Sequence, residues 1–186
     1  MSEEKKKKNE VWEWTKALLI AFGLALVIRT FLFTPIVVDG VSMMPTLEHG
    51  DKMIVNKIGY TIGEPKNFDI VVFHAPEQKD YIKRVIGLPG DEVAYRDDVL
   101  YINGEAFEEP YLDEYKAEIL DGTLTEDFTL EEKWGSKTVP EGHVFVLGDN
   151  RRKSKDSRMI GFVAIDEIIG STKMVFWPFK NIGFVD

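Results

Sequence analysis

The N-terminal region contains one long apolar run, whereas the rest of the chain alternates short apolar runs with polar turns. Residues 17–28 are apolar without interruption, and the run continues to Phe33 after a break at Arg29. A helix over residues 17–33 would span about 25 Å, the short end of a membrane crossing. The run is apolar on every side instead of along one stripe, which disfavours a buried amphipathic helix. We therefore predict a transmembrane helix at residues 15–34.

The flanking residues give this predicted anchor an orientation. Four lysines occupy residues 5–8, and an excess of positive charge marks the cytoplasmic side of a membrane span. Trp12 and Trp14 lie where an interfacial aromatic belt is expected. A cleavable signal peptide has the same basic and apolar parts, but no small-residue cleavage motif follows the run. The sequence predicts a single-pass protein of the cell membrane, with residues 1–14 in the cytoplasm and residues 35–186 forming an extracytoplasmic domain.

Beyond residue 35 the pattern is typical of short β-strands separated by turns. Turn signals at residues 96–98 and at Asn103-Gly104 predict two hairpins. No long helical pattern separates the apolar runs, which favours a mainly β fold of two packed antiparallel sheets. Residues 105–140 are acidic and weakly periodic, so we expect a polar excursion with a short helix near residues 111–119. The predicted strands cover residues 36–38, 52–56, 69–74, 80–86, 93–95, 99–102, 144–147, 161–164 and 172–178.

Charge and composition exclude several functional classes. The formal net charge is −9, and residues 1–35 hold six of the 23 basic and four of the 32 acidic side chains. The remaining domain is therefore strongly acidic and a poor ligand for nucleic acid, whose phosphates need clustered lysine and arginine. The chain has no cysteine, which excludes disulfides, cysteine-based zinc sites and thiol catalysis. Its three histidines lack metal-ligand spacing, so we expect no metal ion and no cofactor.

Candidate chemistry centres on Ser42 and Lys83. Ser42 is followed by Met-Met-Pro, so a proline ring and apolar side chains restrict its loop. Lys83 lies in an otherwise apolar strand, where alternation places it on one face with Tyr81 and Val85. Burial disfavours a charged amine, so the pKa of Lys83 is expected to fall, and a serine with a neutral lysine base is a known catalytic pair. From these residues alone, a loop serine and a solvated Lys83-Arg84 pair are an equally good interpretation.

A third polar cluster covers residues 148–158. Asp156 and Arg158 are spaced for an ion pair, and Ser154 can hydrogen-bond an amine and orient it. Taken by itself, a run this polar is more simply interpreted as a charged surface loop.

Four motifs decide between these interpretations. They are Ser-Met-Met-Pro-Thr-Leu at residues 42–47, Gly-Asp-x-x-x-Val-Asn-Lys at 50–57, Tyr-Ile-Lys-Arg-Val-Ile-Gly-Leu-Pro-Gly-Asp at 81–91 and Gly-Asp-Asn-Arg-x-x-Ser-x-Asp-Ser-Arg at 148–158. In this order, and after one N-terminal anchor, they resemble the type I signal peptidases of Gram-positive bacteria. The resemblance covers roughly residues 11–179, and the motifs around Lys83 and Ser154 are highly specific.

The resemblance implies a membrane-bound serine endopeptidase that removes signal peptides from exported precursors. It implies that Ser42 is the nucleophile and Lys83 the general base, that Ser154 orients the lysine, and that Asp156 and Arg158 form a supporting ion pair. The Ser42 backbone N–H is expected to contribute to the oxyanion hole. In some relatives a serine two residues before the nucleophile adds a second donor, but here that residue is Gly40. A backbone group or water would have to take its place.

The same resemblance implies the binding partners. Signal peptidases cleave after small residues at positions −1 and −3 of a precursor, which shallow apolar pockets select by exclusion. Addition of the substrate as a strand to a sheet edge suits a β fold, and residues 174–179 are expected to enter the outer leaflet of the bilayer or to form a core strand. The matching pocket positions, each of which is as well explained by a place in the core, are Ile36, Val38, Met43, Leu47, Met53, Val72, Tyr81 and Ile82.

Two other functions compete with this interpretation. A Ser-His-Asp hydrolase would use His74 or His143 with a nearby carboxylate, and it would tolerate loss of Lys83. A non-enzymatic anchored β module that binds extended peptides would tolerate replacement of Ser42.

Overall fold

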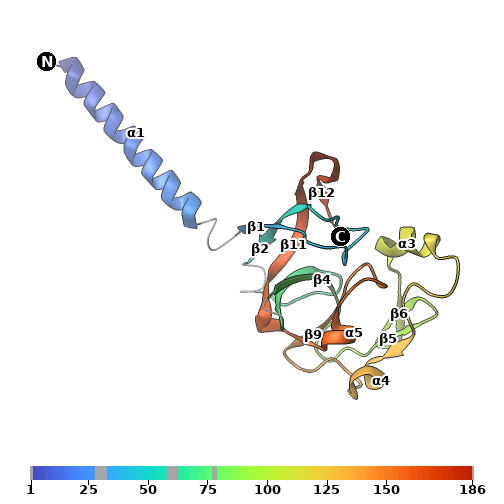
Figure 1. Cartoon of the computed structure of the whole chain (residues 1–186). Coiled ribbons are helices and arrows are strands. Elements are labelled where there is room, and N and C mark those ends of the chain that lie inside the picture. The colour runs from blue at the N-terminus through green and yellow to red at the C-terminus, as the bar shows by residue number, and fades with distance from the viewer. Residues whose placement is uncertain (1, 28–32, 58–62, 77–78, 186) are drawn as a thin grey trace.

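The computed structural model describes residues 2–27, 33–57, 63–76 and 79–185, and its body is mainly β, as predicted (Figure 1). The helices, with short 3-10 helices marked η, are α1 Ser2–Val27, η2 Pro110–Leu112, α3 Asp113–Glu118, α4 Leu130–Trp134, α5 Ser157–Ile160, η3 Ile165–Glu167 and η4 Phe179–Asn181. The strands are β1 Phe33–Val37, β2 Lys52–Asn56, β3 Ile70–Ala75, β4 Lys79–Gly87, β5 Val93–Arg96, β6 Val99–Ile102, β7 Glu105–Phe107, β8 Phe128–Thr129, β9 His143–Leu147, β10 Val163–Ala164, β11 Ile168–Trp177 and β12 Gly183–Phe184.

The larger sheet carries the elements that build the site. Its strand order is β1-β2-β11-β3-β4-β9-β10, with β12 paired to β11, and every pairing is antiparallel. Strand β3 lies inside the sheet, and its sequence is almost continuously apolar. Strand β4 also lies inside the sheet but carries four charged residues, of which Lys83 and Arg84 are buried. Strand β1 pairs with β2 alone among the described strands, so its other edge is available.

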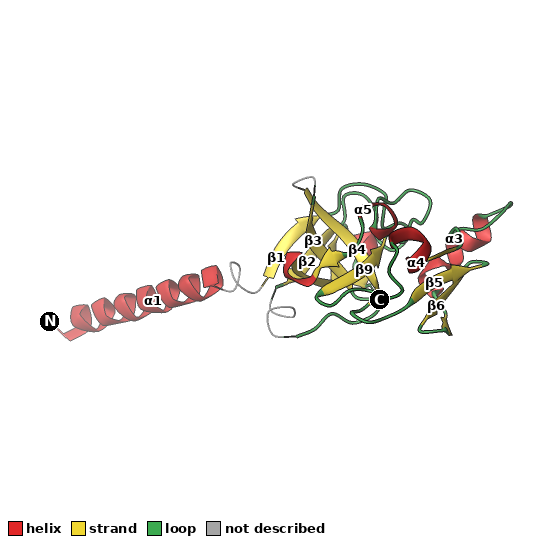
Figure 2. Cartoon of the chain, turned by 90° about the horizontal axis from the view of Figure 1, so that it is seen from below, coloured by secondary structure: helices red, strands yellow, loops and turns green. Residues whose placement is uncertain are grey.

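The smaller sheet combines the predicted hairpin β5-β6 with two short strands, β7 and β8, from the region predicted as a polar excursion. Its order is β7-β6-β5-β8, and it lies with α3 and α4 at the end of the body away from β1 and β2 (Figure 2). The two predicted hairpins are confirmed, with Asn103-Gly104 in the positive-φ conformations of a tight turn. The predicted excursion contains the helix α3, close to the short helix expected near residues 111–119. It also contributes Leu112, Phe128 and Leu130 to the buried apolar residues.

The main core lies between the two sheets. Ile86 and Phe145 come from the larger sheet, whereas Val93, Tyr95 and Leu100 come from the smaller one. Phe128 packs against both Tyr95 and Phe145, with ring centroids 5.4 and 5.8 Å apart. Apolar burial on this scale fixes the sheets relative to each other.

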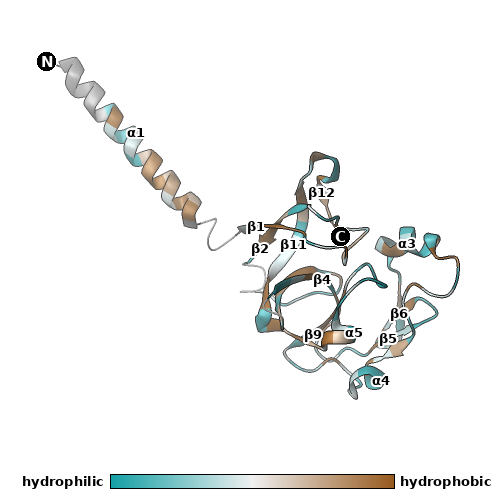
Figure 3. Ribbon diagram, viewed as in Figure 1, coloured by the Kyte–Doolittle hydropathy of each residue, from teal (hydrophilic) through white to brown (hydrophobic). Residues whose placement is uncertain are grey.

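Helix α1 contains the first part of the predicted anchor. Its apolar residues gather toward its C-terminal end (Figure 3), and Leu18, Phe22 and Leu26 are exposed. Within the described ranges, no helix combines the length and the apolar character that a bilayer crossing requires. Residues 28–32, including Arg29, lie outside the described residues, so the predicted segment 15–34 is described only in part.

Candidate active site

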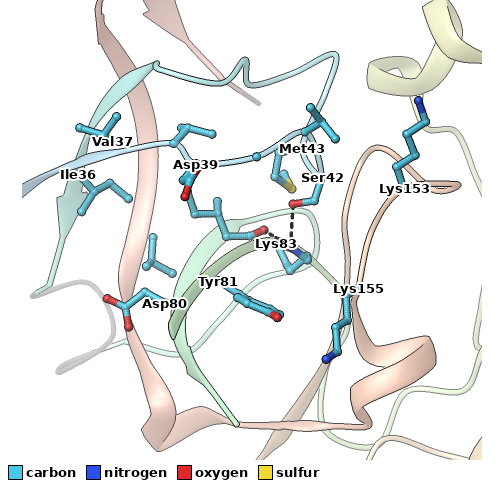
Figure 4. A pocket seen from close by; sticks show the side chains of 15 residues that line it. Ile36, Val37, Asp39, Ser42, Met43, Asp80, Tyr81, Lys83, Lys153 and Lys155 are labelled. Carbon is cyan, nitrogen blue, oxygen red and sulfur yellow. Dashed lines mark hydrogen bonds between the residues drawn. The ribbon is translucent and has the colours of Figure 1, made fainter. Parts of the chain in front are cut away.

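Ser42 and Lys83, 41 residues apart in sequence, meet in one cleft (Figure 4). Ser42 lies in the loop that follows β1, and Lys83 lies on β4. The Lys83 Nζ and Ser42 Oγ atoms are 2.9 Å apart, within hydrogen-bond distance. The Lys83 Nζ also donates a hydrogen bond of 2.8 Å to the backbone carbonyl of Ile82. A nucleophile and a base in direct contact is the arrangement that serine hydrolysis requires.

The Lys83 amine is buried and easily deprotonated. The side chain is 3% exposed, and desolvation lowers the pKa of Lys83 from 10.5 to about 8 although the charges of Asp156 and Asp149 raise it. The Tyr81 ring, 5.0 Å from the Nζ atom, also favours the cation. Burial outweighs these attractions, so a neutral amine is accessible near physiological pH.

The loop that carries Ser42 is held by the segment that follows β9. The Asn150 backbone N–H donates to the Ser42 carbonyl over 3.0 Å, and the Asn150 Nδ2 donates to the Val41 carbonyl over 3.1 Å. Thr46 donates to the Asp149 carboxylate over 2.6 Å. The sequence predicts that Asp149 and Asn150 build a turn and take no part in the chemistry. The structure shows in addition that they hold the backbone around the serine.

Gly148 is a close-contact position beneath the site. A Cβ atom added there would lie 2.1 Å from the Ser154 Oγ and 2.5 Å from the Ser42 carbonyl oxygen. Both distances are shorter than any real Cβ contact. The contact with the Ser42 carbonyl oxygen could be relieved only by a shift of the backbone. Glycine is therefore required where the segment after β9 passes under Ser42.

A buried ion pair anchors Asp149 itself. Arg84 donates from Nε to Asp149 Oδ1 over 3.0 Å and from Nη2 to Oδ2 over 2.7 Å, and both side chains are inaccessible to solvent. Two parallel bonds of this kind are the strongest geometry available to arginine and a carboxylate. Arg84 is thus not part of a solvated charged pair with Lys83: the two side chains point to opposite faces of β4, and both are buried.

The cluster at residues 148–158 is not an ordinary surface loop. Asp156 and Arg158 form a bidentate ion pair with two bonds of 2.8 Å, and Asp156 also accepts from the Gly148 backbone N–H over 3.1 Å. Ser154 departs from the expected geometry. Its buried hydroxyl lies over Gly148 without a hydrogen-bond partner among the described residues. The Lys83 amine donates to the Ile82 carbonyl and not to Ser154.

A second buried ion pair joins the smaller sheet to the site. Arg151 donates to Glu109 over 2.6 Å and to the Gly148 carbonyl over 3.1 Å. Glu109 also accepts hydrogen bonds from Tyr95 and Tyr111, each 2.7 Å long. The residues at 105–140 therefore contribute a structural support that no motif in the sequence indicated.

The cleft has a volume of about 430 Å³ and is lined by both apolar and charged side chains. Two of the predicted pocket residues, Leu47 and Met53, are completely buried in the core beneath the cleft and do not line it. The neighbours of both residues in sequence are less buried than they are, and composition alone cannot reveal this distinction. The predicted pocket residues that do line the cleft are Ile36, Val38, Met43, Val72, Tyr81 and Ile82.

Gly40 also lines the cleft, two residues before Ser42. Its φ of +104° lies in a region that favours glycine, which explains why a serine donor is absent here. The Gly40 backbone N–H donates to the ring of His49 over 3.2 Å, so this N–H already has a partner.

His74 and His143, the histidines of the alternative triad, do not lie in the cleft with Ser42. His74 contacts Asp80 over 2.8 Å, but His74 and His143 line a different pocket from the one that contains Ser42 and Lys83. Among the described residues, no cluster of histidine and carboxylate side chains is arranged to hold a metal ion.

Comparisons with known proteins agree with this geometry. The sequence matches the family described as signal peptidase, peptidase S26, over residues 11–177. Signal peptidase I of Bacillus caldolyticus is 52% identical over 184 residues, which covers 99% of each chain. Signal peptidase I T of Bacillus subtilis strain 168 is 49% identical over 96% of this chain and 91% of that one. The crystal structure of a signal peptidase I from Enterococcus faecalis V583 has 49% identity and a TM-score of 0.57, covering 59% of this chain and 97% of that chain.

Proposed function

Because the chain belongs to the signal peptidase family, peptidase S26, we propose that Ser42 and Lys83 form its catalytic dyad. The chain is a serine endopeptidase of the signal peptidase I type, and its substrates are precursors that carry signal peptides. The observation that carries the assignment of the dyad is the 2.9 Å contact between the Ser42 Oγ and a buried Lys83 amine.

The chemistry follows from this contact. Neutral Lys83 accepts the proton of the Ser42 hydroxyl while the Oγ atom attacks the carbonyl carbon of the scissile bond. The Ser42 backbone N–H stabilises the negative charge that develops on the carbonyl oxygen. Protonated Lys83 then returns its proton to the leaving amine. Water, activated by the same amine, hydrolyses the acyl-enzyme ester and regenerates Ser42.

Three further residues are assigned supporting roles in this proposal. The Asp156–Arg158 pair holds Gly148 from one side, and the Asp156 charge limits how far the Lys83 pKa falls. The Ser154 side chain packs on Gly148 between these groups. Together they keep the Lys83 amine and the Ser42 hydroxyl in contact. The rate of the reaction depends on this contact by orders of magnitude, because proton transfer and attack need a defined geometry.

The shape of the cleft supports binding of an extended substrate with small side chains. Strand β9 pairs with β4 only from Arg84 onward in the described register, so the β4 backbone around Tyr81 and Lys83 faces the cleft without a neighbouring strand on that side. The opposite wall is the end of β1 and the loop that follows it. A precursor lying between these walls would place its residues −1 and −3 against Ile36, Val38 and Ile82, where large side chains would not fit.

The dyad assignment is tested by the Ser42→Ala variant of the full chain. It should leave a purified precursor intact, a loss of about 10⁴-fold or more in kcat, because no other nucleophile can form the ester. Cleavage is followed by the shortening of the precursor on a gel and by sequencing of the new N-terminus. His143→Ala serves as the matched control and should retain wild-type cleavage. The reverse pattern would replace the dyad by a histidine-based triad.

We further propose that residues 15–34 anchor the chain in the cell membrane and leave residues 35–186 outside the cytoplasm. The support is the apolar run from Ala17 to Phe33 after a basic N-terminus. A second apolar surface lies on the catalytic domain around β11 and η4, and it would rest on the outer leaflet. Its exposed members are Met174, Trp177, Phe179, Ile182 and Phe184.

The absence of cysteine gives a direct test of this topology. Lys137→Cys, at an exposed site of the catalytic domain, should react with a membrane-impermeant maleimide on intact cells. Ser2→Cys should react only after the cells are lysed. Equal labelling of both variants on intact cells, or of neither, would contradict the proposed orientation.

A further inference from the structure

The cleft that contains Ser42 carries opposite charges on its two sides. Asp39 and Asp80 line it on the side of β1, whereas Lys153 and Lys155 line it beyond the Ser42–Lys83 contact (Figure 4). All four side chains are exposed. Two lysines at one end of a cleft are unexpected in a domain whose acidic side chains far outnumber its basic ones.

The backbone that carries the two lysines is fixed to the catalytic groups. The Lys153 N–H donates to the Asn150 carbonyl over 3.0 Å, and the Asn150 N–H in turn donates to the carbonyl of Ser42. Between the lysines, the Ser154 hydroxyl is turned inward against Gly148. Lys153 and Lys155 therefore lie on a fixed segment and are exposed at one end of the cleft.

The position of the lysines identifies the part of a substrate that they meet. Ile36 lies on the other side of Ser42 from the two lysines (Figure 4), where residues before the scissile bond bind under the function proposed above. A chain that crosses Ser42 in an extended conformation must then continue toward Lys153 and Lys155. The residues after the scissile bond, which become the N-terminus of the mature protein, lie beside the two amines.

We propose that Lys153 and Lys155 select precursors with acidic side chains among the first three residues after the scissile bond. This inference rests on the proposed function, because it needs cleavage at Ser42. Carboxylates at these positions pair with the ammonium groups and offset the repulsion of the acidic domain, whereas lysine or arginine there is repelled. Exposed ion pairs are weak, so the preference for acidic over basic substrates in kcat/KM should be about fivefold at low salt.

The test uses the full chain in detergent micelles and three otherwise identical precursors. Their residues −3 to −1 are Ala-Gln-Ala, and the next three residues are acidic, neutral or basic. Wild type should cleave the acidic precursor about fivefold faster than the basic one, with the neutral one between them. The Lys153→Glu/Lys155→Glu double variant should reverse this order, and the corresponding double glutamine variant should remove the preference.

Two controls separate local from general electrostatics. Lys137→Glu makes the same change at an exposed lysine that does not line the cleft, and it should preserve the wild-type ratio. The preference should shrink between 0.1 and 1 M salt, because the Debye length falls from about 10 Å to about 3 Å.

Each outcome has a defined meaning. A wild-type ratio that the glutamate variant leaves unchanged would overturn the role of the lysines while the proposed function stands. Equal shifts in the Lys137→Glu control would likewise overturn it in favour of overall charge. If wild type leaves even the neutral precursor uncut, the proposed function fails, and the lysine proposal fails with it.

Discussion

Replacing Lys83 with methionine should abolish precursor cleavage and, at neutral pH, make the folded chain more stable. The loss of the proposed general base should lower kcat by about 10³-fold or more, because Ser42 keeps its proton. The gain in stability has a separate origin. Lowering the Lys83 pKa from 10.5 to about 8 corresponds to roughly 3 kcal/mol of unfavourable free energy for the charged amine in the folded chain. Methionine has similar length and carries no charge that must be desolvated.

The pH dependence of the two effects has a defined sign. Because the folded pKa lies below the unfolded one, the unfolded chain binds more protons between pH 8 and pH 10.5, and wild-type stability rises with pH in this window. The advantage of the methionine variant should therefore be about 1–3 kcal/mol at pH 7, after the lost hydrogen bonds are subtracted. It should disappear above pH 10.5.

Urea unfolding of both proteins in the same detergent measures this difference, and the activity of wild type gives an independent check. Its kcat/KM should rise with pH and level off above a midpoint near 8, as the amine loses its proton. Arg84→Met is the matched control on the same strand. It strips Asp149 of its partner and should destabilise the chain by about 3 kcal/mol or more. A methionine variant at position 83 that is less stable than wild type at pH 7 would contradict the account of a desolvated amine.

Gly148→Ala should inactivate the enzyme although Gly148 contributes no side chain to the reaction. The new methyl group would lie 2.5 Å from the Ser42 carbonyl oxygen and 2.1 Å from the Ser154 Oγ, so the segment and the serine loop must separate. A displacement of the nucleophile by about 1 Å is enough to lower kcat about 100-fold. The cost in stability should be about 1–3 kcal/mol, which is typical of overpacking in a core.

A second variant separates the two contacts. Adding Ser154→Gly removes the clash with the hydroxyl but leaves the clash with the Ser42 carbonyl, so the double variant should recover part of the stability and little of the activity. Precursor cleavage and circular dichroism under the same conditions report the two quantities. If Gly148→Ala retains kcat within twofold of wild type, the close approach of these backbones does not position Ser42.

The sequence predicts the reactive pair better than its surroundings. The local pattern marks Ser42 and Lys83 as candidates, and the specific motifs around them, through their resemblance to a known family, favour a catalytic pair over a loop serine and a solvated lysine. The contact between Arg84 and Asp149 joins residues 65 positions apart, and no local pattern reveals such a pairing. The need for glycine at position 148 is equally hidden, because it depends on how closely two backbones pass.

The fold of residues 105–140 is hidden in the sequence for a different reason. Its strands β7 and β8 have three and two residues, too few for alternation to be visible. Acidic side chains also dominate its composition, and one of them, Glu109, is buried with Arg151. A carboxylate whose partner is distant in sequence looks the same as a solvated one, so the segment resembles a loop until the fold is known.

The link from Glu109 through Arg151 to the Gly148 carbonyl couples the catalytic centre to the integrity of the smaller sheet. If that sheet opens locally, the carbonyl loses its donor and an unpaired arginine is left in the core. A chain that has not finished folding should therefore lack the support under Ser42, and we expect it to be inactive toward neighbouring proteins.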